Sequence, residues 1–176
     1  MTLELRLPTA QEEDEVLRAH RATSPEVPTF LHHYEEGMPL RQYLEVLAKH
    51  RHGEHLPPHL VPSTFLFAFV GPRIVGRASI RHRLSPVLEH VGGHIGYAVV
   101  PEFRRKGYGT EILRQAIVIA REQLGLARVL VTCDEDNVAS ICVIERNGGV
   151  LEDVVTGADL SQPKRRYWID TAVIES

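Results

Sequence analysis

The segment that most constrains the fold is residues 91–125. An apolar run up to Val100 leads into a short loop with three cations and two glycines. A long helix pattern with one apolar face follows and ends at Gly125. A change from strand to helical periodicity across one loop is typical of a strand–loop–helix unit. The segment therefore predicts a domain that combines strands with helices.

The remaining elements follow from periodicity and from turn residues. We predict helices over 10–22, 40–52 and 137–147, and strands over 3–7, 65–70, 74–80, 91–100, 128–133, 150–156 and 165–173. Residues 23–39 and 53–63 are rich in Pro and Gly and are predicted to be loops. This order of elements and a length of 176 residues indicate one α/β domain over residues 1–176.

Composition excludes several classes of protein. The chain has 20 Lys and Arg against 23 Asp and Glu, so we expect no basic face for nucleic acid. Its apolar runs are far shorter than the roughly 20 residues that cross a bilayer, so no membrane partner is expected. Cys133 and Cys142 form no metal-type or redox-type pair, and no secretory pattern is recognisable. We expect a cytoplasmic protein with reduced thiols.

The loop before the long helix has the chemistry of an anion site. The first amides of a helix lack partners within the helix and carry a partial positive charge. Gly107 and Gly109 would let a phosphate approach the main chain, and Arg104, Arg105 and Lys106 add positive charge. The loop therefore predicts a pyrophosphate site.

Two familiar phosphate motifs do not match this loop. The chain contains no Gly-Lys pair, which excludes a P-loop, and Ile112 occupies the place of the third glycine of a dinucleotide fingerprint. The sequence from Arg104 to Gly109 instead resembles motif A of the GCN5-related N-acetyltransferase (GNAT) family, Arg/Gln-x-x-Gly-x-Gly/Ala. Residues 94–101 look like the fourth strand of that family, and residues 137–148 look like its motif B. The order of elements is similar across nearly the whole chain.

The resemblance implies a fold and a co-substrate. The fold is a GNAT-like single domain with a central mixed, mostly antiparallel sheet, flanked by helices, whose fourth and fifth strands splay apart. Acetyl-CoA is the implied co-substrate, and no metal is expected. The residues implied to bind acetyl-CoA, by main chain or side chain, are Val99, Val100, Arg104, Arg105, Lys106, Gly107, Tyr108, Gly109, Thr110, Asn137 and Ser140.

The implied activity is acetyl-CoA-dependent N-acetyl transfer to a primary amine of a small molecule or peptide, by direct attack. A main-chain amide near Val99 is expected to stabilise the oxyanion. The Tyr with which many relatives protonate the thiolate falls on Ile144, which cannot donate a proton. Cys142 is a weak substitute that is expected to lie in the core. A non-catalytic CoA or acyl-CoA sensor module of the same fold is the alternative.

The base is sought near the fourth strand. His94 is the first candidate, because a histidine with an ordinary pKa near 6.5 suits proton transfer at neutral pH. Glu89 and His90 are the next candidates.

The acceptor cannot be read from the sequence. The resemblance implies that residues 22–39 and 155–168 form its binding face. The acidic residues 134–136 either attract a cationic amine or form a solvated helix start. The length of the acyl group and the oligomeric state stay open, with a homodimer among the alternatives.

Overall fold

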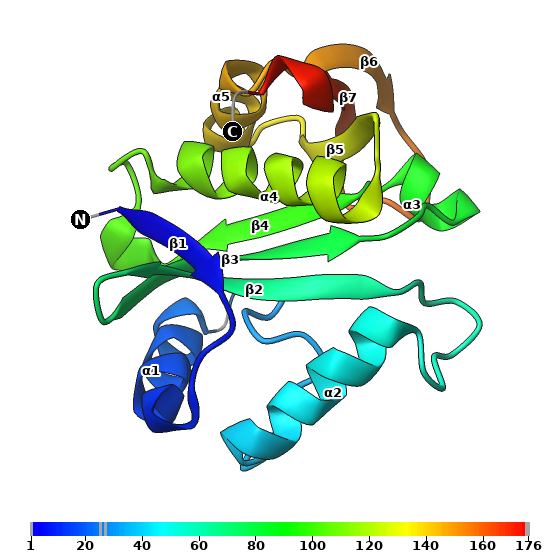
Figure 1. The fold of residues 1–176 in the computed structure, drawn as a ribbon. Helices are drawn as coiled ribbons and strands as arrows, with labels where there is room; N and C mark the ends of the chain where they lie inside the picture. Colours follow the sequence, from blue (N-terminus) through cyan, green and yellow to red (C-terminus); the bar gives the residue numbers. More distant parts are fainter. Residues whose placement is uncertain (1, 25, 27, 175–176) are drawn as a thin grey trace.

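The computed structural model describes residues 2–24, 26 and 28–174, and its strands form two sheets (Figure 1). One sheet has the order β1-β2-β3-β4 and the other β5-β7-β6. The strands are β1 (Leu3–Arg6), β2 (Ser63–Val70), β3 (Arg73–Arg81), β4 (Ile95–Val99), β5 (Arg128–Asp134), β6 (Val150–Val155) and β7 (Lys164–Asp170).

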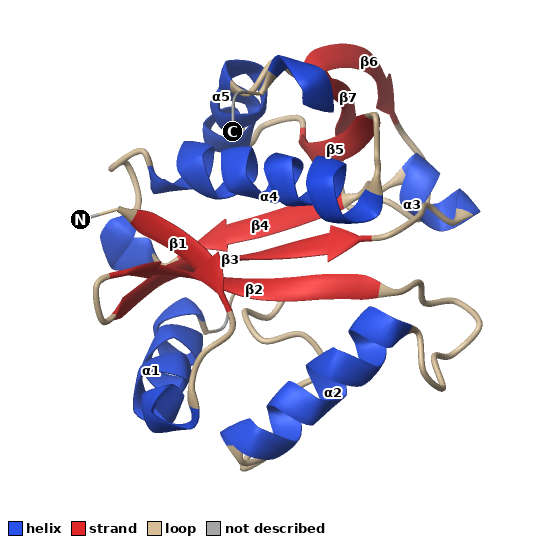
Figure 2. Ribbon diagram, viewed as in Figure 1, coloured by secondary structure: helices blue, strands red, loops and turns tan. Residues whose placement is uncertain are grey.

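Helices cover both faces of the four-stranded sheet (Figure 2). The α-helices are α1 (Glu13–Thr23), α2 (Leu40–His52), α3 (Pro86–His90), α4 (Tyr108–Leu124) and α5 (Val138–Arg146), and short 3-10 turns span Ala10–Glu12, Pro101–Phe103 and Thr171–Val173. Helix α4 lies on one face of the sheet, and α1 and α2 lie on the opposite face (Figure 1).

Each face of the sheet has its own hydrophobic core. The apolar stripe of α4, which includes Ile112, Ala116 and Ile117, packs between the two sheets and is fully buried. On the opposite face, Tyr43 of α2 and Phe67 of β2 have no exposed surface and belong to a second cluster. The two cores hold β3 and β4 as a fixed layer between the helices.

The two sheets separate between β4 and β5. Every strand pair in the described residues is antiparallel, and β4 pairs with β3 alone. The expected splay is therefore present. The expected mixed sheet is replaced by two antiparallel sheets, because β4 and β5, the strands that α4 connects, share no ladder.

The main departure from the sequence prediction is at residues 81–94. The short helix α3 was not predicted, and the strand predicted over 91–100 is confined to Ile95–Val99. Gly92 and Gly93 have φ angles of +103° and +62°, which end any extended run before His94. These two glycines form a turn that lies beside β5, because the Gly92 amide donates to Thr132 Oγ1 of β5 at 2.9 Å.

Candidate active site

The closed end of the splay is a junction between His94 and Leu130 of β5. The His94 amide donates to the Leu130 carbonyl at 2.7 Å, and the Leu130 amide donates to His94 Nδ1 at 2.9 Å. A Cβ on Gly93 would lie 2.3 Å from the Leu130 carbonyl oxygen, so only glycine permits this approach. From this junction the strands diverge toward the end of β4.

Beyond the junction, β4 presents alternate main-chain groups to the gap. Antiparallel strands exchange hydrogen bonds at every second residue, and Val100 donates to Val75 of β3 at 2.9 Å. The amides of Val99 and Tyr97 therefore point away from β3, toward the gap. The Val100 carbonyl also accepts from Phe103 at 2.9 Å. Val99, and not Val100, offers a free amide.

The loop between β4 and α4 is shaped by two residues with left-handed backbone. Arg105 has a φ of +62° and Gly107, the N-cap of α4, a φ of +83°. Such alternation turns successive amides toward one concave surface, which binds anions. Among the described residues, no amide from Arg105 to Gly109 donates to a loop, turn or side-chain acceptor. The main chain can therefore hold a pyrophosphate.

The three cations of this loop differ in their surroundings. Arg104 donates to both carboxylate oxygens of Glu26 at 2.7 Å and to the Val99 carbonyl at 3.1 Å, so it fastens the loop. Lys106 lies 5.3 Å from the centre of the Phe103 ring. Arg105 and Lys106 are exposed and supply the mobile positive charge.

The opposite wall of the gap is the start of α5. Asn137 caps this helix, because its side-chain oxygen accepts from the Ser140 amide at 3.0 Å. The Tyr97 hydroxyl donates to Ser140 Oγ at 3.2 Å and spans the gap from β4. Burial is the main cause that raises the pKa of Tyr97, to about 12.

These elements enclose one cleft of about 680 Å³. It runs from the α4 loop, past the gap, to the far face of β4. Among the described residues, its lining comprises most of the predicted cofactor residues, the start of α5 and a few residues beyond β4: Glu26, Pro28, Arg77, Tyr97, Ala98, Val99, Phe103, Arg104, Arg105, Gly107, Tyr108, Gly109, Thr110, Asn137, Ala139, Ser140, Cys142, Val143 and Arg146.

Residues 2–150 match the family model of the acetyltransferase (GNAT) domain. The chain belongs to the GNAT acetyltransferase family. Membership confirms the predicted family, its fold and the assignment as an acyltransferase, with acetyl-CoA as co-substrate.

Solved structures with the same fold include several acetyltransferases. RimL, a ribosomal-protein alpha-N-acetyltransferase in complex with coenzyme A, is 17% identical, with a TM-score of 0.70 over 97% of this chain and 94% of that one. MccE, a microcin self-immunity acetyltransferase in complex with acetyl-CoA and AMP, is 18% identical, with a TM-score of 0.68 over 96% and 92%. A spermidine N-acetyltransferase chimera that derives partly from Vibrio cholerae is 14% identical, with a TM-score of 0.64 over 99% and 98%.

The base candidates were expected to lie at the cleft, but none of them lines it. His94 precedes β4, is 6% exposed and lines no part of the cleft. Burial, with a smaller effect of Arg81, lowers its pKa to about 4. Neutral His94 accepts at Nδ1 and so carries its proton on Nε2, which leaves no lone pair for a proton. Glu89 and His90 are exposed on α3, away from the cleft lining.

The candidate acids also lie differently from the prediction. Ile144 is fully buried in the core beneath α5, so its position does not face the cleft. Cys142 was expected in the core, but it is exposed and lines the cleft. Cys133 of β5 is the buried thiol, and burial is the main cause that raises its pKa to about 11.

The acidic residues after β5 are largely paired. Asp134 forms an ion pair with Lys164 of β7, and Glu135 lies 4.0 Å from Arg165. None of residues 134–136 lines the cleft. The geometry therefore favours a structural role for this acidic group over attraction of a cationic amine.

Three functional candidates were missed in the sequence. Arg77 is a charged residue within the apolar strand 74–80, and this pattern in the sequence could have indicated a buried cation. Tyr97 lies two residues before Val99, so strand periodicity places it on the same face of β4. Glu26 has no local signal, because its partner Arg104 lies 78 residues away.

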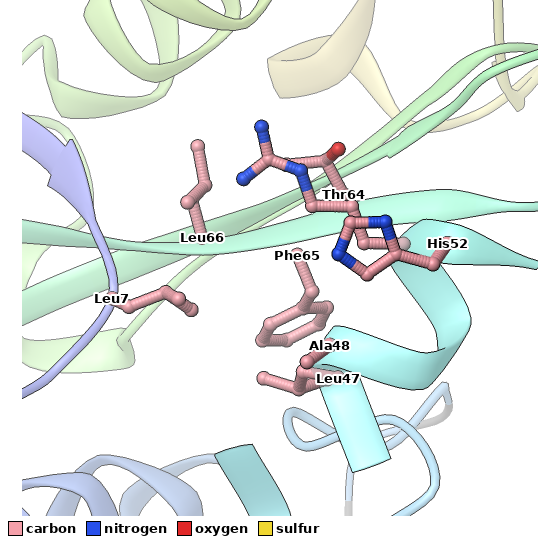
Figure 3. Close-up of a pocket in the computed structure, with 8 residues that line it drawn as sticks. Leu7, Leu47, Ala48, His52, Thr64, Phe65 and Leu66 are labelled. Atoms are coloured by element: carbon pink, nitrogen blue, oxygen red, sulfur yellow. The ribbon is translucent and has the colours of Figure 1, made fainter. Parts of the chain in front are cut away.

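The remaining features of the described residues add no metal ligands or second cavity to this site. Within the described ranges, no group of three or more His, Cys, Asp or Glu is arranged to hold a metal, and no helix has the length and apolar character to cross a bilayer. A separate hollow of about 390 Å³ lies beside β2, where Leu7, Leu47 and Phe65 line it (Figure 3). It shares no lining residue with the cleft.

Proposed function

We propose that residues 1–176 form a single N-acetyltransferase domain that transfers acetyl from acetyl-CoA directly to a primary amine of a small molecule or peptide. The observation that carries this proposal is the open edge of β4 beside the α4 loop. Strands β6 and β7 continue the sheet of β5, which supports one domain beyond the family match at residue 150. The cytoplasmic location and the homodimer stay predictions.

The chain itself supplies positioning and charge stabilisation. The amides from Arg105 to Gly109 hold the pyrophosphate, which fixes the thioester end of the co-substrate near the gap. The Val99 amide points into the gap and is placed to stabilise negative charge on the thioester carbonyl oxygen. Acetyl-CoA supplies the activated acetyl group and a thiolate leaving group.

Proton transfer in this proposal does not use His94. The Tyr97 and Ser140 hydroxyls are the hydrogen-bonded pair at the gap, and they replace the proton donor that is missing at Ile144. Within the described lining of the cleft, Glu26 is the sole carboxylate, and Arg104 occupies both of its oxygens. The acceptor amine therefore enters in its neutral form.

Calorimetry with acetyl-CoA and a thiol-release assay with an amine panel test the proposal. We expect binding, thiol release, and a loss of about 100-fold or more in kcat for a Tyr97→Phe, Ser140→Ala double variant that still binds acetyl-CoA. Binding without thiol release for any amine would favour the sensor module. Absence of acetyl-CoA binding would refute both readings.

A further inference from the structure

A buried guanidinium without a hydrogen-bond partner at its Nε lines the cleft. Arg77 of β3 is 2% exposed, and its Nε has no hydrogen-bond partner. Among the described residues, no carboxylate lies within ion-pair distance of Arg77, and no hydrogen bond involves its side chain. Its contact with the Phe65 ring, 5.7 Å from the ring centre, does not replace a hydrogen bond.

The surroundings of Arg77 add positive charge and hydrogen-bond donors. A Cβ on Gly96 would lie 3.9 Å from both terminal nitrogens of Arg81 and 4.0 Å from Nη1 of Arg77, so both guanidinium groups face the same side of β4. Arg81 donates to the carbonyls of Gly92 and Gly93 at 3.0 Å, which holds it in place. Burial is the main cause that lowers the pKa of Arg77 to about 10.

His32, from the loop between α1 and α2, completes this group. Its Nε2 is buried without a partner. Burial, followed by the charges of Arg77 and Arg81, lowers the pKa of His32 to about 3, so it is neutral at physiological pH. A neutral imidazole can donate one hydrogen bond beside the Arg77 guanidinium.

A buried cation without a counter-charge is costly, and proteins rarely keep one without a partner. Here the cation lines a cleft, so an anion that enters the cleft would supply the missing partner. Arg77 lies directly opposite Ala98 in the strand pair, so it is about one strand spacing from the β4 edge that carries the Val99 amide. The anion and the reacting amine of one molecule must therefore be only a few atoms apart.

We propose that the acceptor is an amine that carries a carboxylate or phosphate group a few atoms from its nitrogen, and that Arg77 binds this anion. Amino acids, small phosphorylated amines and peptides with an acidic first residue share this chemistry. A polyamine does not, because two buried cations repel it. This inference rests on the proposed function, since it names the class of acceptor for the same cleft.

Matched acceptor pairs compare an acidic acceptor with a neutral one, with rates compared per concentration of unprotonated amine. The pairs are alanine and alaninamide, phosphoethanolamine and ethanolamine, and two peptides that begin with Glu or Gln. We expect kcat/KM for the acid member of at least one pair to exceed its neutral partner by about 10- to 100-fold, the effect of one charge-assisted hydrogen-bond pair. The pair that responds identifies the source of the anion.

Variants then assign the preference to Arg77. Arg77→Met retains shape without charge, and we expect it to abolish the preference for the acid member while the Kd for acetyl-CoA is unchanged. Arg77→Lys should restore part of the preference. Arg41→Gln, at an exposed residue of α2, is the matched control for loss of one arginine and should behave as wild type.

Two outcomes overturn the inference. One is equal or faster release of thiol with the neutral members of all three pairs in the wild-type protein, a result that needs no variant to fold. The other is an acid preference that survives in Arg77→Met. Failure of the proposed function looks different, because then no amine of either kind releases thiol.

Discussion

Replacing Gly93 with alanine tests how the closed end of the splay is held. Gly93 has a φ of +62°, and an added Cβ would lie 2.3 Å from the Leu130 carbonyl oxygen and 2.8 Å from its carbon. Both atoms belong to the backbone of β5, which is held by its ladder with β7, so neither can rotate away. The methyl group must therefore push β5 away from the turn.

The expected loss has two parts. Left-handed backbone costs alanine about 1–2 kcal/mol. Displacement of β5 also breaks the two hydrogen bonds between His94 and Leu130, each worth about 1 kcal/mol. Gly93→Ala should thus lower the free energy of unfolding by about 3–4 kcal/mol, which for a domain of this size lowers Tm by at least about 6 °C.

Gly125→Ala provides a matched control. Gly125 has a φ of +66°, but a Cβ there would meet nothing within 4 Å, so this variant carries the backbone cost alone. Urea unfolding of the two variants should differ by about 2 kcal/mol. Calorimetry should show weaker acetyl-CoA binding for Gly93→Ala only. Equal losses of stability in the two variants would refute the argument that the Leu130 contact requires glycine.

Three shorter predictions concern the loop, the histidines and the thiols. Gly107→Ala should cost about 1–2 kcal/mol in urea unfolding and raise the Kd for acetyl-CoA about tenfold in calorimetry, because its methyl group enters the space that the anion approaches. The pKa values of His94 and His32 are lowered from 6.5 to about 4 and about 3, so the stability they contribute is complete above pH 6.5 and is lost as pH falls from 6.5 toward those values. Urea unfolding from pH 7.5 to 4.5 should show this loss, and His94→Asn should reduce its slope, whereas an unchanged slope would contradict the assignment. A thiol reagent should modify exposed Cys142 quickly and Cys133 slowly, and acetyl-CoA should protect Cys142; equal rates would contradict the placement of the two thiols.

Features with a local cause were predicted well from the sequence. The long helix ends at Gly125 as expected, because the stop signal lies at the helix end itself. The α4 loop was predicted from its own glycines and cations.

Features that depend on distant contacts were not predictable in the same way. The role of His94 changes because Leu130, 36 residues away, donates to its ring. Cys133 and Cys142 both lie on amphipathic elements, and only the packing of β5 and α5 decides which thiol is buried. The break at Gly92 was visible as a Gly-Gly pair, but its meaning depends on the strand that it meets.

The ion pair between Arg104 and Glu26 connects the loop before α4 with the segment between α1 and α2. Arg104 belongs to the loop that receives acetyl-CoA, and Glu26 belongs to the segment between α1 and α2, which the family resemblance assigns to the acceptor face. Any movement of one loop on binding its ligand changes the free energy of the other. Linkage then requires that acetyl-CoA and the acceptor alter each other's affinity by the same factor.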